Sequence, residues 1–187
     1  KRGRSKGEKG ALNPGMLEVA AAGEQNKIYQ LEKHLILLLF IEPELIFELD
    51  RYLKKNELPS LSLADIESGD LQAVLNVILH SLQQIDLDPE EFIAQNIPDE
   101  LRELENEGRQ MITEGTAHAR LLEDLIRTVL LLRKHKLNEK IEDLSFLQQT
   151  AESPDEVKDM EMQKEVLNSI KMRALIEKAQ SNLFVRT

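Results

Sequence analysis

The sequence predicts an all-α protein: a multi-helix bundle from which a C-terminal antiparallel helical hairpin protrudes. Aromatic residues make up only 4% of the chain, whereas Leu, Ile, Glu, Lys and Gln, several of which favour helices, are abundant. Apolar residues recur at three- and four-residue spacing over much of its length, which is the period of an amphipathic helix. With 187 residues, of which 41% are hydrophobic, the chain is long enough to bury a substantial core.

The N-terminal segment differs in composition from everything that follows. Residues 1–10 carry five Lys or Arg against one Glu, and glycine is frequent there. Because such a segment has little to bury, it predicts a flexible basic linker over residues 1–24, acting either as a solubilising tether or as a weak nucleic-acid contact. The chain starts at Lys1 rather than Met, so we expect it to be part of a longer protein.

The most hydrophobic stretch is a run of seven apolar residues, 35–41, followed directly by Glu-Pro-Glu. A bilayer span takes about 20 residues, so the run is too short to cross a membrane. It predicts instead a helix over 24–41 that is buried on all sides at the centre of the bundle. Pro43 cannot continue this helix but suits the first turn of the next, which is expected over 43–56.

Further bundle helices are predicted from their start signals. These signals are a Ser or Asp cap, or a Pro at the first helical position. After a loop over 60–70, they are Ser68 or Asp70 for a helix to Ile85, Asp88-Pro89-Glu90-Glu91 for a short helix, and Pro98 for a helix to about Thr113. The bundle is therefore expected over residues 25–133.

The C-terminal third has narrower apolar stripes. One long helix is expected over 116–149, and Ser153-Pro154-Asp155-Glu156 predicts the start of a last helix that ends near Ser181. Two helices that each bury a single stripe should form a hairpin, which with its tail covers 134–187 and folds semi-independently of the bundle. The predicted seam consists of Leu137, Ile141 and Leu144 facing Val157, Met160, Leu167 and Ile170.

No pattern in the sequence indicates catalysis, so we expect a non-enzymatic chain without catalytic residues, cofactor or metal. The absence of Cys excludes a disulfide, a cysteine-ligated zinc site and a thiol nucleophile. The four histidines are far apart in sequence, and no glycine-rich phosphate loop is present. A formal net charge of −10 disfavours strong binding to nucleic acid, and no segment suggests contact with a membrane.

Two motifs carry a resemblance to a known family. The first is Glu-x-x-Leu, an apolar run and Pro-Glu-Leu, here within residues 32–45; the second is the charged hairpin, here 130–149 and 154–181. In their order, behind a basic linker, they resemble the C-terminal helicase-binding domain of bacterial DNA primases, over residues 25–181. The resemblance implies a cytoplasmic, non-catalytic domain that docks the primase on the hexameric replicative helicase during primer synthesis.

Nine residues of the hairpin and tail are candidates for the helicase contact. Phe146, Val166 and Met172 flank the predicted seam and should point outward, whereas Leu183 and Phe184 follow the last helix without evident burial. An exposed apolar cluster of this kind is a candidate partner site. The full set is Phe146, Leu147, Val166, Leu167, Ile170, Met172, Arg173, Leu183 and Phe184.

Three alternatives remain open from the sequence. The candidate residues could fold back on the bundle or mediate weak self-association. The chain could also be the N-terminal collar domain of a replicative helicase, which the bundle resembles as well. Finally, it could be a helical adaptor or regulatory domain that is unrelated to replication.

Overall fold

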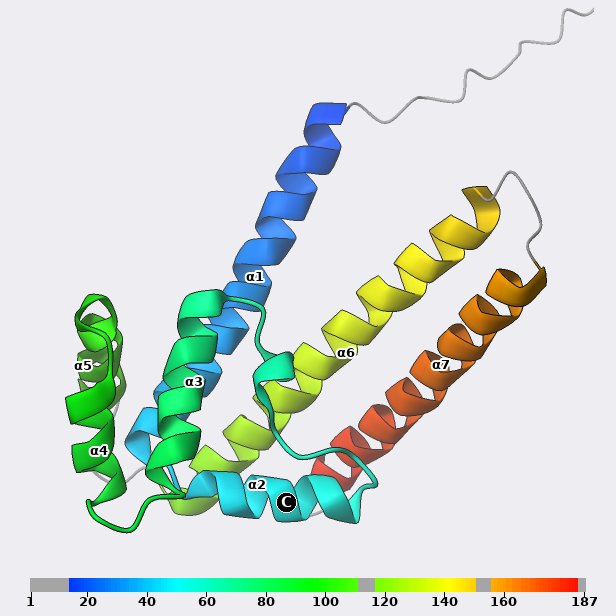
Figure 1. Cartoon of the computed structure of the whole chain (residues 1–187). Helices are drawn as coiled ribbons and strands as arrows, with labels where there is room; N and C mark the ends of the chain where they lie inside the picture. The colour runs from blue at the N-terminus through cyan, green and yellow to red at the C-terminus, as the bar shows by residue number, and fades with distance from the viewer. Residues whose placement is uncertain (1–13, 111–116, 151–155, 185–187) are drawn as a thin grey trace, which may run out of the picture.

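The computed structural model describes residues 14–110, 117–150 and 156–184, and within these ranges every regular element is helical (Figure 1). The predicted all-α, multi-helix fold is therefore confirmed. The α-helices are α1 (Pro14–Ile41), α2 (Leu45–Lys55), α3 (Gly69–Ser81), α4 (Pro89–Asn96), α5 (Arg102–Gln110), α6 (His118–Thr150) and α7 (Glu156–Phe184). No helix in these ranges has an apolar stretch long enough to cross a membrane.

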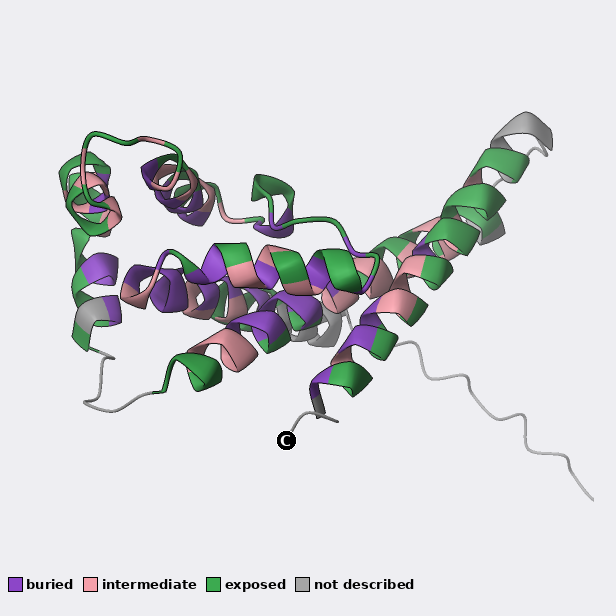
Figure 2. Ribbon diagram, turned by 90° about the horizontal axis from the view of Figure 1, so that it is seen from below, coloured by how far each residue is buried: buried purple, intermediate pink, exposed green. Residues whose placement is uncertain are grey.

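The core forms where the C-terminal half of α1 packs against α3, α5 and α6. Residues 35–40 are all buried, with no side chain more than 6% exposed. Neighbouring helices cover this segment on several sides, which explains why apolar residues occur all around it. The central buried helix predicted from the apolar run is therefore present, and Figure 2 shows the buried residues gathered there.

The turn between α1 and α2 keeps the chain compact. Pro43 is buried in the turn, and α2 begins two residues later at Leu45. The backbone N–H groups of Leu45 and Ile46 donate to the carbonyls of Glu42 and Pro43 at 3.2 and 3.3 Å. As a result, α2 turns its apolar face, including Leu49, towards the core.

The start of α3 is held by a residue from α1. Ser68 occupies the predicted N-cap position, but its side chain makes no capping hydrogen bond. Instead the carboxylate of Glu32, which is only 1% exposed, accepts hydrogen bonds from the backbone N–H groups of Glu67 and Ser68. A carboxylate at a helix N-terminus satisfies unpaired donors and complements the helix dipole. Glu32 thus fixes α3 against α1.

The peripheral helices α4 and α5 begin close to the positions that their start signals predict. Asp88 accepts a hydrogen bond from the backbone N–H of Glu90 at 3.0 Å, and Pro89 is the first residue of α4, as predicted. The helix expected from Pro98 begins as a 3₁₀ turn, Asp99–Leu101, before α5. At Gly108 a Cβ atom would lie 2.9 Å from the Cβ of Phe40, so α5 approaches α1 at a distance that only glycine allows.

Helix α1 begins earlier than predicted. It starts at Pro14 rather than near residue 24, so part of the predicted 1–24 linker is helical. Residues 16–22 contain Met, Leu, Glu and three Ala, which are good helix formers, and Pro14 suits the first turn. The basic residues of the predicted linker lie outside the described ranges.

Helices α6 and α7 run side by side in opposite directions (Figure 1). Pairs of side chains link them in reverse sequence order: Lys134 with Glu177 at 3.3 Å and Lys140 with Glu165 at 3.4 Å. The segment that joins them, with its predicted Ser-Pro-Asp start signal, lies outside the described ranges.

Arg133, at the predicted boundary between the bundle and the hairpin, joins α6 to the loop before α3. Helix α6 continues without a break across this position, and Arg133, 8% exposed, binds both carboxylate oxygens of Asp65 at 2.6 and 2.8 Å. Its guanidinium also donates to the backbone carbonyls of Pro59 and Ser60. This buried, fully paired cation fixes the loop before α3 to α6.

The C-terminal part of α7 returns to the core, although the narrow apolar stripes predicted a hairpin that protrudes from the bundle. Ile176 and Ala179 are 0% exposed, and Leu183 is 9% exposed. The hydroxyl of Tyr52 donates to the carbonyl of Ala179 at 2.6 Å. Because α7 runs antiparallel to α6, its end arrives beside α2. The end of α7 is therefore part of the bundle core, whereas semi-independent folding of the hairpin stays a prediction.

Candidate protein-interaction surface

The inward face of α7 is set by a seven-residue repeat. Ser169, Ile176 and Leu183 are 5%, 0% and 9% exposed and lie seven residues apart. A seven-residue repeat is the spacing at which one helix keeps the same face towards a partner helix. Val166 and Met172 lie beside this repeat and are half-buried. The face of α7 that contacts α6 is thus centred on residues 166, 169, 173 and 176.

This orientation overturns the predicted seam on α7. Met160, Leu167 and Ile170 were expected to be buried, but they are 70%, 57% and 43% exposed. Val166 and Met172 were expected to point outward, but they are half-buried. The reason is the buried C-terminal end: packing of residues 176–183 against the bundle fixes the rotation of the whole helix. The side chain of Val157, another predicted seam residue, lies outside the description.

The outward face of α7 carries an apolar stripe, formed by Met160, Leu167, Ile170 and Ala174. All four are exposed, and their spacing of seven, three and four residues places them on one face of the helix. We call these four residues the α7 stripe. Near the end of α6, Phe146 and Leu147 are 65% and 53% exposed. Half of the ten large hydrophobic side chains exposed in the described ranges therefore lie between residues 146 and 170.

A row of lysines borders the α7 stripe. Lys164, Lys171 and Lys178 are exposed, and each follows a stripe residue by four positions, which is about one helical turn. None of the three makes an ion pair within the described part of the chain. The acidic residues Glu165 and Glu177 lie on the side facing α6, where they pair with its lysines. The stripe therefore has a basic edge on a chain whose formal net charge is −10.

The nine predicted contact residues separate into groups in the structure. Phe146, Leu147, Leu167 and Ile170 are exposed, as a docking surface requires. Three others are half-buried: Val166, Met172 and Arg173, the last within 3.5 Å of the amide oxygen of Asn138.

The two tail candidates do not join this surface. Leu183 was expected to lie beyond the last helix without burial, but it lies inside α7 and is buried, because α7 continues to residue 184 and packs against α2. The side chain of Phe184 lies outside the description. Met160 and Ala174 were not among the candidates; counting back in sevens from Leu183 would have placed both outside the buried face.

At the opposite end of α6, His118 joins two acidic residues. Its Nδ1 lies 2.8 Å from Oε1 of Glu42, and its Nε2 lies 3.0 Å from Oε1 of Glu48. The hydrogen bond to Glu42, followed by that to Glu48, raises the pKa of His118 above 6.5. The contact links the start of α6 to the turn before α2. Among the described residues, no three or more His, Cys, Asp or Glu side chains form a group that could hold a metal ion.

Comparisons of this chain with protein families, with curated proteins and with solved structures found no match.

Proposed function

We propose that this chain is a non-catalytic domain of a bacterial DNA primase that docks the primase on the hexameric replicative helicase in the cytoplasm. The order of the sequence motifs suggests the family, as argued above. The observation that supports docking is the α7 stripe, together with the exposed Phe146 and Leu147 near the end of α6. Exposed apolar residues gathered on one part of a surface are typical of protein-interaction sites.

The basic edge of the stripe defines the chemistry of the partner. Lys164, Lys171 and Lys178 flank apolar side chains, so a helix that presents an apolar face with an acidic border would complement them. Such charge pairs mainly increase the association rate and fix the orientation of the partner, whereas the apolar contacts supply most of the affinity. Docking in this way raises the local concentration of a linked primase at the helicase.

A pair of charge-adding substitutions tests the docking surface. Leu167→Asp places a charge in the proposed contact, where its desolvation is costly, so affinity for the N-terminal region of the helicase should fall by about tenfold or more. Asn76→Asp adds the same charge at an exposed position on α3, outside the stripe and its row of lysines, and should change affinity by less than about twofold. Isothermal titration calorimetry with full-length chains would measure both. Equal affinities for the two variants would remove the stripe from the interface.

Self-association of the chain must be distinguished from binding to the helicase. Sedimentation of the chain alone, at the concentration used for calorimetry, should give a monomer or a weak equilibrium. If the chain formed a stable ring or dimer that Leu167→Asp dissolved, the stripe would bind a second copy. A collar-type assembly would then replace the docking proposal.

A further inference from the structure

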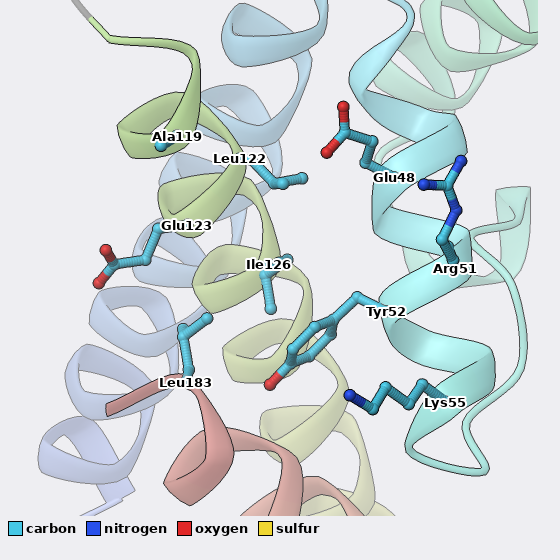
Figure 3. A pocket seen from close by; sticks show the side chains of 9 residues that line it. All are labelled: Glu48, Arg51, Tyr52, Lys55, Ala119, Leu122, Glu123, Ile126 and Leu183. Carbon is cyan, nitrogen blue, oxygen red and sulfur yellow. The ribbon is translucent and has the colours of Figure 1, made fainter. Parts of the chain in front are cut away.

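The bundle carries a cleft whose lining includes none of the four α7 stripe residues. It has a volume of about 570 Å³ and lies between α2, the first half of α6 and the end of α7 (Figure 3). Its apolar lining comes from Leu122, Ile126, Leu183 and the ring of Tyr52. The hydroxyl of Tyr52 is bound to the carbonyl of Ala179, which holds the ring in place as a wall. Volumes of 300–1,000 Å³ are typical of preformed ligand sites.

Four charged side chains also line this cleft, but only two of them are already paired. Glu48 lies 3.0 Å from His118, and Glu123 lies 2.7 Å from Arg127. Arg51 and Lys55 have neither an ion pair nor a hydrogen bond from their side chains within the described ranges. Figure 3 shows Tyr52 and Lys55 both extending from α2 towards α6 and α7. The unneutralised charge at the cleft is therefore positive.

Arg51 and Lys55 are one helical turn apart, and like charges at this spacing destabilise a helix slightly. A ligand carboxylate that bridges them would relieve this repulsion and form charge-assisted hydrogen bonds. A ligand with only apolar groups would leave both cations without a partner.

From this geometry we propose that the cleft binds an acidic, apolar peptide segment of a partner protein, independently of the α7 stripe. One or two apolar side chains would lie on Leu122, Ile126 and the Tyr52 ring, and neighbouring carboxylates would pair with Arg51 and Lys55. A nucleic acid fits poorly because Glu48 and Glu123 interrupt any basic track along the cleft. The last residues of this chain fit poorly too, because they bring a further cation, Arg186.

The probe for this site is a fluorescein-labelled octapeptide of alternating Asp and Leu, with a matched octapeptide in which Asn replaces Asp. Fluorescence anisotropy with the full chain should show saturable binding of the Asp peptide and at least tenfold weaker binding of the Asn peptide. Failure of the Asp peptide to bind would overturn the proposal.

Two substitutions and one control locate the site. Lys55→Glu should weaken binding of the Asp peptide by at least tenfold, whereas Lys54→Glu should change it by less than twofold, since Lys54 is exposed on α2 but does not line the cleft. Ala119→Trp fills the cleft without changing its charge and should abolish binding. Circular dichroism checks that each variant remains helical.

The remaining outcomes decide against the proposal. If Lys55→Glu and Lys54→Glu weakened binding of the Asp peptide equally, the peptide would be attracted by positive charge in general and not by the cleft. If deleting residues 185–187 increased affinity tenfold, the end of the chain itself would be the occupant. Helicase binding is measured separately and should be unaffected by Lys55→Glu, so failure at the cleft leaves the docking proposal intact.

Discussion

The two halves of the α6–α7 pair differ sharply although the same two helices run through both. In the bundle-side half, α6 residues 118–136 and α7 residues 172–183, the side chains between the helices join the core. In the distal half, α6 residues 137–148 and α7 residues 160–171, Ser169 is the only buried residue, and several large apolar residues are exposed. Figure 2 shows this part of the two ribbons mostly in the colours of exposed and intermediate residues. Burial in the first half therefore determines which residues the second half exposes.

The largest expected difference between the halves concerns buried charge. Arg133→Ala leaves Asp65 buried without its cation, which costs about 3–5 kcal/mol of the free energy of unfolding. Lys140→Ala, in the distal half, removes an exposed pair with Glu165 and should cost at most about 1 kcal/mol. Urea unfolding followed by circular dichroism measures both values. Similar losses would mean that the two halves do not differ in this way.

A second comparison uses two isoleucines of α7. Ile176→Ala removes a fully buried side chain and should lower the free energy of unfolding by about 2–5 kcal/mol. Ile170→Ala, 43% exposed in the native chain, should change it by about 0.5 kcal/mol or less. If the exposed isoleucine proved as important as the buried one, α7 would be rotated relative to the structure described here.

The smallest expected effect concerns pH at the start of α6. Because the pKa of His118 is raised in the folded state, its contribution to stability is present below about 6.5, the unfolded value, and is lost as pH rises through the folded pKa. His118→Gln should therefore destabilise the chain more at about pH 6 than at about pH 9. Thermal unfolding at both values measures this difference, and a pH-independent loss would show that charge is not involved.

Local sequence signals were sufficient for several elements of the fold. The apolar run 35–41 identified the central helix, and the Asp-Pro-Glu-Glu sequence before Phe92 identified the start of α4. In both cases the structure depends on residues that are close together in the sequence, so a local pattern was enough to predict it. The capping of α3 by Glu32 could not be predicted, because the carboxylate comes from a helix 35 residues away.

The rotation of α7 shows why the candidate site was only partly predictable. Apolar residues occur around much of this helix, so more than one face could be taken as the buried one. The choice depends on the contact of Ala179 and Leu183 with α2, which is a tertiary contact. The buried seven-residue repeat also includes the polar Ser169, so the repeat could not be recognised from apolar residues alone. The cleft was not predictable because three helices distant in sequence line it.

Hydrogen exchange of the chain, with and without the N-terminal region of the helicase, shows whether the distal half of the α6–α7 pair is the docking surface. The docking proposal predicts that binding slows exchange of backbone amides in residues 144–148 and 160–174, while α3 and α4 remain unchanged. Amides of these exposed distal helices open more readily than those of the core, so added protection there is measurable. Protection confined to α4 and α5, with no change in the distal half, would contradict docking through the α7 stripe.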